Sequence, residues 1–414
     1  MATIKPFLCI RPDAALAHRV AALPYDVYNR SEAKAAAAKD AISFLNIDRA
    51  ETQFPDETDT YADCVYAKAS ELLQARIADG TFLADPVRSY YIYELTMDGR
   101  VQTGITACAS IDDYLGNVIK KHENTRAEKE EDRIRHVDTC NAQTGPIFLA
   151  YRRNETIHSI VEKTKQNAPL YDFTADDGVT HRVFVISEPS DVAAVSDAFS
   201  KIDSIYIADG HHRAASAVKV GLKRRAAHPG YDGTEEFNFF LSVLFPEDEL
   251  KILPYYRVVR DLNGLTKEAF LASISEHFTA EPLDNTAFSP SEKGTFGMYL
   301  DHTWYRLTAS DSLRQITDPV DSLDVSLLQN YLLAPVLGIG DPRTDKRIDF
   351  IGGIRGLGEL ERRVSEDMTV AFSMYPTSIS ELFAVSDAGR LMPPKSTWFE
   401  PKLRSGLFIH MLGD

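Results

Sequence analysis

The sequence contains little cysteine, and none of it is spaced for a zinc or redox site. Its 414 residues include four cysteines, and no two of them are separated by only two residues. Zinc knuckles and redox-active pairs commonly use that C-x-x-C spacing, so the sequence indicates neither. Cys9 and Cys108 lie in apolar runs, where they behave as small hydrophobic residues. We therefore expect a reducing compartment.

Long apolar runs and targeting signals are also missing. No stretch approaches the roughly 20 apolar residues that a membrane-spanning helix needs. The first residues lack a basic segment followed by a long apolar one. We expect a cytoplasmic protein without a membrane partner. The net charge of -16 repels a phosphate backbone, so we expect a small-molecule substrate and no nucleic-acid partner. Nothing in the sequence selects an oligomeric state.

Three signatures of common nucleotide and zinc enzymes do not occur. The chain has neither G-x-x-x-x-G-K-[ST] nor a G-x-G-x-x-G that follows a strand. His122-Glu123 is followed by Asn, Thr and Arg, so H-E-x-x-H is absent as well. The sequence therefore excludes the standard P-loop, dinucleotide-binding and zinc-protease motifs.

The pattern of apolar residues predicts an α+β protein with more than one module. Hydrophobic residues make up 44% of the chain, which is enough for packed cores. Alternating residues around Asp98-Gly99 predict a β-hairpin, and a helical pattern is found over 61–77. We predict three parts: an N-terminal segment, 1–85, that packs on the core; a catalytic core, 86–260; and an additional C-terminal α+β module, 261–414.

The strongest candidate site is Asp209-Gly210-His211-His212-Arg213. A short apolar stretch over 204–208 predicts a buried strand that runs into it, and a helix is predicted over 214–220, closed by Gly221. Free backbone N–H groups at the start of such a helix, together with the helix dipole, favour an anion. The five residues therefore predict a phosphate-binding turn.

Each side chain of this turn has a role to offer. Gly210 permits a tight turn, and Arg213 presents a planar fork to phosphate oxygens. His211 and His212 can donate to an oxyanion or act in acid–base catalysis. Asp209 could hold Mg²⁺ or orient a histidine. The alternative is that the paired histidines only cap the helix and bond to surface carbonyls.

A second candidate lies at Lys120-Lys121-His122-Glu123-Asn124-Thr125-Arg126. The positive charges around Glu123 would keep its carboxylate ionised, as a general base requires. His122, Thr125 and Arg126 are candidates for contact with the substrate. The alternative is a solvated, charged loop.

Two further segments are candidates for substrate binding or closure. Lys395-Ser396-Thr397 follows two prolines, and its ammonium and hydroxyl groups could contact a phosphate or carboxylate. Arg343 lies in 341–353, a segment with paired glycines. Each segment could equally be a turn beside a strand or helix.

Seven blocks, in this order, resemble the domain of unknown function 1015 family over nearly the whole chain. They are Pro24-Tyr25-Asp26-Val27, Lys121-His122-Glu123-Asn124-Thr125, Glu131-Asp132-Arg133, Gly145-Pro146-Ile147-Phe148, Ile207-Ala208-Asp209-Gly210-His211-His212-Arg213, Leu253-Pro254-Tyr255 and Met392-Pro393-Pro394-Lys395-Ser396-Thr397. In its central part, that family is similar to free serine kinases of the ParB/sulfiredoxin-like fold, which carry a His-Glu pair and an Asp-Gly-His-His-Arg turn. The resemblance implies a ParB/sulfiredoxin-like mixed-sheet core, with Glu123 as the base and 209–213 as the phosphate cradle.

The leading hypothesis is a phosphotransferase, a small-molecule kinase that acts on a hydroxyl compound. Free L-serine, giving O-phosphoserine, is the first candidate acceptor, and ATP, ADP or pyrophosphate is the donor. Mg²⁺ would bridge the donor phosphates. One alternative is a metal-dependent phosphohydrolase with Asp209, His211 and His212 as ligands. Another is a non-catalytic sensor of a nucleotide or phosphorylated metabolite.

Overall fold

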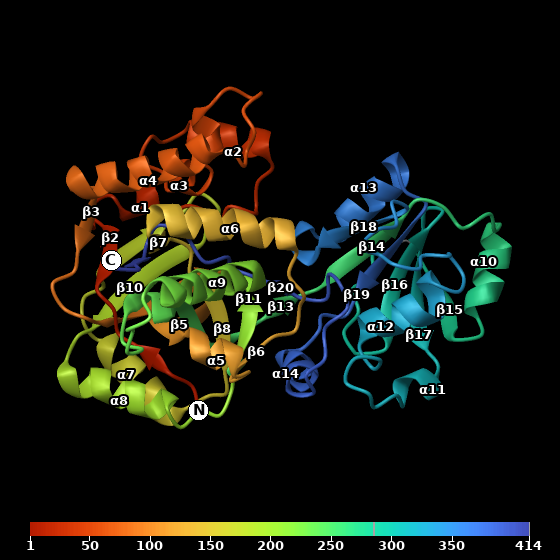
Figure 1. Cartoon of the computed structure of the whole chain (residues 1–414). Coiled ribbons are helices and arrows are strands. Elements are labelled where there is room, and N and C mark those ends of the chain that lie inside the picture. Colours follow the sequence, from red (N-terminus) through yellow and green to blue (C-terminus); the bar gives the residue numbers. More distant parts are fainter. Residues whose placement is uncertain (285, 414) are drawn as a thin grey trace. The chain divides into compact units, whose positions relative to one another are not determined.

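The chain forms two compact units in the computed structural model, which describes residues 1–284 and 286–413 (Figure 1). Unit 1 consists of Met1–Leu250 and Pro401–Asp414, and unit 2 of Lys251–Glu400. Both units combine helices with sheets, which confirms the α+β class. The division differs from the expected module 261–414, because the last strand pairs with strands of unit 1.

Unit 1 is built on a mixed sheet with the order β6-β11-β8-β12-β5-β4-β10-β9, and β1 also pairs with β5. The pairs β6–β11 and β8–β12 are parallel, and the other pairs are antiparallel. The strands of this sheet are β1 (Ile4–Lys5), β4 (Tyr90–Met97), β5 (Arg100–Ser110), β6 (Ile119–Lys120), β8 (Ile147–Tyr151), β9 (Tyr171–Thr174), β10 (Thr180–Ile186), β11 (Ile205–Asp209) and β12 (Phe239–Pro246).

A smaller antiparallel sheet joins distant parts of unit 1. Its order is β3-β2-β21-β7, formed by Phe82–Ala84, Cys9–Pro12, Ile409–Met411 and Ala142–Gln143. Ile409 of β21 packs in one core with Val20, Phe44 and Leu73 from the N-terminal segment, and with Cys140. β21 therefore ties the end of the chain to unit 1.

The helices of unit 1 cover its sheets. They are α1 (Ala17–Val20), α2 (Arg30–Ala37), α3 (Leu45–Asp48), α4 (Asp63–Ala78), α5 (Ile111–Leu115), α6 (Ala127–Cys140), α7 (Glu155–Thr164), α8 (Pro189–Phe199) and α9 (His211–Ala227). The main core combines apolar residues of the sheet with residues of α7, α8 and α9. α6 and α9 lie side by side, as Figure 1 shows.

Unit 2 contains an antiparallel sheet with the order β15-β17-β16-β19-β14-β18 and a two-stranded ribbon. The sheet strands are β14 (Tyr255–Val259), β15 (Phe278–Leu283), β16 (Thr295–Leu300), β17 (Thr303–Ala309), β18 (Ile348–Gly352) and β19 (Val370–Met374). The ribbon pairs β13 (Ile252–Leu253) with β20 (Trp398–Phe399). The helices are α10 (Lys267–Ile274), α11 (Asp311–Arg314), α12 (Asp324–Leu328), α13 (Gly358–Glu366) and α14 (Ile379–Asp387).

Local sequence signals predicted the hairpin around Asp98-Gly99 but not the end of α9. The expected turn joins β4 to β5, with positive φ angles at Asp98 and Gly99. Gly221 does not end its helix, however, and α9 continues to Ala227. A Cβ atom at Gly221 would lie 2.5 Å from the carbonyl oxygen of Phe237, so this glycine allows close packing. Within the described residues, no helix combines the length and apolarity needed to cross a membrane.

Candidate functional site

Two parallel strands bring the two strongest sequence motifs together. β6 pairs in parallel with β11, with Ile119 opposite Ile205. Because the strands run in the same direction, the segments that follow them start from the same edge of the sheet. The segment after β6 carries His122-Glu123, and the segment after β11 carries Gly210 and the start of α9.

The turn between β11 and α9 requires glycine. Gly210 is the N-cap of α9 and has a φ angle of 91°, in the left-handed region. A Cβ atom at this position would lie 3.0 Å from Nε of Arg213, whose side chain packs over the turn. The N–H groups of the first helical turn have no acceptor within the helix, so they are available to an anion.

His211 contacts both residues of the His-Glu pair. Its Nε2 accepts a hydrogen bond from the backbone N–H of His122, with an N···N distance of 3.5 Å. A nitrogen that accepts carries no proton, so the neutral ring holds its proton on Nδ1. That Nδ1 lies 3.7 Å from Oε2 of Glu123, whose side chain is 61% exposed. Burial, followed by the neighbouring His122, keeps the pKa of His211 well below its ordinary value.

His122 lies beneath this contact and is almost fully buried. Burial lowers its pKa to about 4, even though Asp209 favours the charged form. Its Nδ1 is buried and has no hydrogen-bond partner among the described residues. An unpaired buried polar atom typically costs about 1–3 kcal/mol, so this nitrogen is suited to a partner from outside the chain.

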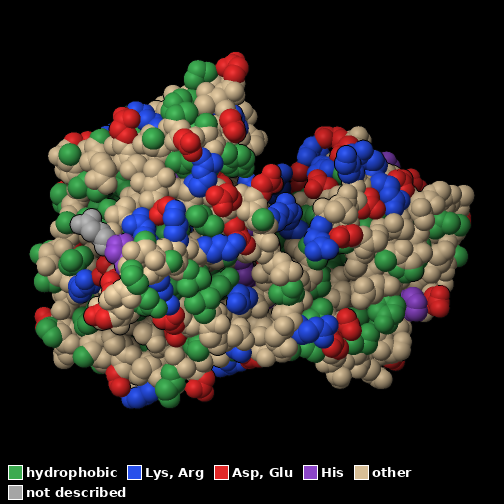
Figure 2. Space-filling view, in the orientation of Figure 1, with side chains coloured by type: hydrophobic (Ala, Val, Ile, Leu, Met, Phe, Trp, Pro, Cys, Tyr) green, Lys and Arg blue, Asp and Glu red, His purple; other side chains and the backbone are tan. Residues whose placement is uncertain are grey.

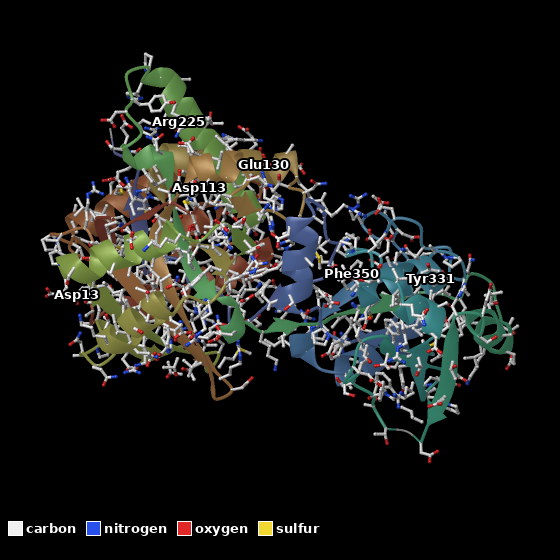
Figure 3. The ribbon with its side chains drawn as sticks, turned by 90° about the horizontal axis from the view of Figure 1, so that it is seen from below. Asp13, Asp113, Glu130, Arg225, Tyr331 and Phe350 are labelled. Atoms are coloured by element: carbon white, nitrogen blue, oxygen red, sulfur yellow. The ribbon has the colours of Figure 1, made fainter. Side chains whose placement is uncertain are left out.

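Hydrogen bonds of His212 and Thr125 hold the loop that precedes α6. Nε2 of His212 accepts from the backbone N–H of Arg126 at 3.0 Å. The Thr125 hydroxyl donates to Glu130, which also accepts from Lys219; Glu130 is labelled in Figure 3. In this conformation, the Thr125 hydroxyl is bonded to Glu130 and not to a substrate. Nε2 of His212 accepts a hydrogen bond, so it cannot donate one to phosphate. The expected oxyanion role would fall to Nδ1.

Two cations flank Asp209. Its Oδ2 lies 3.2 Å from Nζ of Lys402 and 4.0 Å from Nη2 of Arg213, and its Oδ1 accepts from the N–H of Gly210 at 2.8 Å. Burial raises the pKa of Asp209, but Lys402 and Arg213 outweigh it and hold the pKa far below its usual range. Arg213 also donates to the carbonyl of Pro146 at 2.7 Å.

Two basic residues of this region, Lys402 and Arg133, were not predicted as site residues from the sequence. Lys402 follows the unit 2 segment, far along the chain from Asp209, so no local spacing signals the contact. Arg133 belongs to the Glu131-Asp132-Arg133 block of the family resemblance, but the sequence predicted no functional role for it. It is buried, contacts Asp132 and lies over the ring of Tyr25.

Two neighbouring cavities open beside these residues. One, of about 30 Å³, is lined by Arg213, Arg133, Gly145 and Ser405. The other, of about 370 Å³, shares Arg133 and Tyr25 with it and is also lined by polar side chains. These polar residues include Asp26, Asn29, Asp48, Arg49, Glu51, Lys129 and Asp132. The larger cavity is big enough for a small polar metabolite.

The side chains that the structure describes do not form a cluster suited to a metal ion. Among residues 1–284 and 286–413, no group of three or more His, Cys, Asp or Glu side chains is arranged to hold a metal ion. Of the ligands expected for a metal-dependent phosphohydrolase, Asp209 contacts Lys402, and Nε2 of His211 faces a backbone N–H group.

The expected closure residues Arg343, Lys395, Ser396 and Thr397 lie in unit 2. Arg343 forms an exposed ion pair with Asp341. Lys395 has a φ angle of 57°, the Ser396 hydroxyl donates to the carbonyl of Pro393, and Thr397 precedes β20. The segment from Pro393 is thus a turn with its own hydrogen bonds.

Charged residues over α6 and α9 are mixed in sign. Figure 2 shows Lys and Arg side chains beside Asp and Glu side chains there. Lys223 and Arg224 both bind Asp138, and Arg225 binds Asp112. This short basic cluster is therefore paired with acidic groups and does not form a surface of one sign.

Comparisons with known proteins place the chain in a sequence family. The model of the family described as protein of unknown function (DUF1015) matches residues 4–326. No curated protein matches.

Three similar solved structures are distant in sequence and in fold. A free serine kinase in complex with ADP has 13% identity and a TM-score of 0.35, over 72% of this chain and 88% of that chain. A conserved hypothetical protein from Pyrococcus furiosus has 13% identity and a TM-score of 0.33, over 74% and 94%. SbnI from Staphylococcus aureus, with a C-terminal truncation, has 12% identity and a TM-score of 0.35, over 71% and 82%. The ParB/sulfiredoxin-like core stays a prediction.

Proposed function

The chain belongs to the DUF1015 family of proteins of unknown function, and from this premise and the geometry of the site we propose that unit 1 is a phosphotransferase. It would move a phosphoryl group from a nucleotide or pyrophosphate to the hydroxyl of a small compound. The family name carries no activity, so the proposal depends on the residues. L-serine is the leading acceptor because the motifs around Glu123 and Asp209 resemble those of free serine kinases.

One observation carries the proposal: a carboxylate lies beside the N-terminus of a helix. Oε2 of Glu123 is 3.7 Å from Nδ1 of His211, the first residue of α9. The helix start attracts the phosphoryl group, and the carboxylate is placed next to that group. A base and an anion site at this separation are the two parts that transfer to a hydroxyl requires.

The reaction then needs one proton transfer and one displacement. Glu123 takes the proton of the acceptor hydroxyl, whose oxygen forms a bond to phosphorus. The bond from phosphorus to the bridging oxygen of the donor breaks, and that oxygen keeps the electron pair. Arg213 and the first N–H groups of α9 stabilise the negative charge on the phosphoryl oxygens.

The buried histidines keep the site ready for this chemistry at neutral pH. Burial lowers the pKa of His122 to about 4 and that of His211 well below its ordinary value, so both rings are neutral. A neutral His211 carries its proton on Nδ1, 3.7 Å from Oε2 of Glu123, and does not compete for the substrate proton. Glu123 is therefore the base in this scheme, and the histidines position it.

The test is product formation with each donor in turn. The full-length protein is incubated with magnesium and L-serine, separately with ATP, ADP and pyrophosphate, and O-phosphoserine is measured by mass spectrometry. Glu123→Gln is the test variant. Glu128→Gln is the matched control, because Glu128 is an exposed carboxylate in the first turn of α6.

We expect phosphoserine with at least one donor, a loss of about 100-fold or more in Glu123→Gln, and no change in Glu128→Gln. Equal product from Glu123→Gln would contradict the assigned base. No product with any donor would remove serine as the acceptor. Stabilisation by a nucleotide without turnover would favour a sensor.

A further inference from the structure

Arg257 is a buried cation in unit 2 without an acidic partner among the described residues. It lies in β14, near the edge of the sheet, and its residue surface is 4% exposed. Its guanidinium donates only to two backbone carbonyls, those of Tyr255 and Lys395, among the described residues. No described carboxylate forms an ion pair with it. Two of its five N–H groups are thus used, and the charge is not balanced.

An uncompensated buried charge is costly, and proteins normally pair it. Burial lowers the pKa of Arg257 to about 9, so the side chain still carries its charge at neutral pH. A chain that only needed to fill this position would be more stable with an apolar residue. The retained charge therefore points to an anion from outside the chain.

A cavity adjoins the guanidinium. It has a volume of about 350 Å³ and is lined by Arg257, Gln329, Arg343, Phe350, Pro393 and Pro394, among others. Phe350 of β18 lies directly opposite Arg257 of β14, so the two side chains leave the same face of the sheet. The guanidinium carbon is 5.3 Å from the ring centroid of Phe350, which is labelled in Figure 3.

The same cation holds the turn that borders the cavity. Nη2 of Arg257 donates to the carbonyl of Lys395 at 3.0 Å. Lys395 has a φ angle of 57°, a left-handed conformation that is unfavourable for a non-glycine residue. The prolines of this turn line the cavity wall. The turn of the Pro-Pro-Lys-Ser-Thr segment thus forms one side of the cavity.

We propose that this cavity of unit 2 binds a small organic molecule with one anionic group, a carboxylate or a phosphate, and a flat apolar ring. The anion would contact the free N–H groups of Arg257, which offer a planar fork. The ring would lie against Phe350, Pro393 and Pro394. This site is formed within unit 2 and does not depend on the function proposed for unit 1.

The test uses three probes with the same ring on the full-length protein. Benzoate supplies a carboxylate, phenyl phosphate supplies a phosphate, and benzyl alcohol is neutral. Binding is measured by saturation-transfer NMR of the probe, titrated to obtain Kd. Arg257→Met removes the charge and keeps the apolar stem. Arg355→Met is the matched control, because Arg355 is an exposed arginine of the same unit that pairs with Glu359.

We expect one or both anions to bind the wild-type protein and benzyl alcohol to bind at least tenfold more weakly. Arg257→Met should weaken anion binding by about tenfold or more, and Arg355→Met should leave it unchanged. The probe that binds more tightly shows whether the anionic group of the ligand is a carboxylate or a phosphate. Binding of neither anion, or equal binding by wild type and Arg257→Met, would overturn the proposal.

Two further measurements keep the test decisive if Arg257→Met folds poorly. Phe350→Ala, on an edge strand, removes the aromatic ring that would contact the probe. We expect this variant to bind the anionic probe more weakly than wild type. Equal Kd values for this variant and wild type would overturn the site. Without a probe, Arg257→Met should have a Tm equal to or above that of wild type, whereas a purely structural arginine would give a clear decrease.

Discussion

The imidazole of His211 stands edge-on to the imidazole of His122, with ring centroids 4.4 Å apart and ring planes at 82°. A proton on either ring would place a charge beside the other ring in a buried space. Burial and this proximity together lower the pKa of His211. The pair is therefore neutral at physiological pH, and in the proposed reaction the exposed Glu123 is the group that takes the proton of the substrate.

The buried His122 predicts a loss of stability in weak acid. Its pKa falls from an ordinary 6.5 to about 4 on folding, so the unfolded chain binds the proton more tightly. Stability is full above pH 6.5 and is lost as the pH falls toward 4, by about 3 kcal/mol for this residue. We expect urea unfolding to show this decrease.

The His122→Gln variant isolates that contribution. Its stability should depend less steeply on pH between 6.5 and 4 than that of wild type. His18→Gln, at an exposed position, should keep the wild-type slope. Parallel pH profiles for wild type and His122→Gln would contradict the assignment, since other buried histidines such as His181 are common to both proteins.

The turn at Gly210 predicts a position-specific cost for alanine. Gly210→Ala adds a side chain at φ 91° and meets Arg213 at 3.0 Å. Gly178→Ala is the matched control, because its φ is 80° and nothing lies within 4 Å. Both variants should lose about 1–2 kcal/mol of stability. Only Gly210→Ala should also weaken inorganic phosphate binding, measured by calorimetry, because it displaces Arg213; equal phosphate Kd values would argue against the turn as the anion site.

We predict that Lys402, near the end of the chain, contributes to the stability of unit 1 through its contact with Asp209. Lys402→Met removes the cation 3.2 Å from Asp209, which should raise the pKa of that carboxyl. The depressed pKa of Asp209 contributes stability at neutral pH that is lost in strong acid. Because both side chains are partly exposed, we expect a loss of about 1 kcal/mol at pH 7.

Chemical denaturation at pH 7 measures this effect. Lys201→Met is the control, since Lys201 pairs with Asp197 at the surface, and it should change stability by less than about 0.5 kcal/mol. A Lys402→Met protein that unfolds at the same denaturant concentration as Lys201→Met would show that the contact with Asp209 contributes nothing.

Two helical glycines predict opposite effects of alanine. Gly221→Ala in α9 would place a Cβ atom 2.5 Å from the carbonyl of Phe237 and 2.7 Å from Ile111. This overlap should cost about 1–3 kcal/mol, despite the better helix propensity of alanine. Gly358→Ala at the start of α13 meets nothing within 4 Å and should be neutral or stabilising. A stabilised Gly221→Ala, by thermal unfolding, would mean that α9 can move from Phe237.

Local sequence patterns predicted most of the elements that depend on neighbouring residues. Asp98-Gly99 predicted the β4–β5 hairpin, and the short apolar stretch over 204–208 predicted β11. The helix pattern over 61–77 corresponds to α4, Asp63–Ala78. These signals are reliable because backbone conformation and side-chain alternation act over a few residues.

The sequence by itself determined that Asp209 to Arg213 lie at the junction of a strand and a helix, because that depends on neighbouring residues. Tertiary structure alone decided what the turn faces. The parallel pairing of β6 with β11 places Glu123 beside His211. The C-terminal segment from Pro401, which belongs to unit 1, brings Lys402 into contact with Asp209. Packing against Phe237 made Gly221 a contact position inside a helix. Such contacts join residues far apart in the chain, and no local pattern encodes which distant groups will meet.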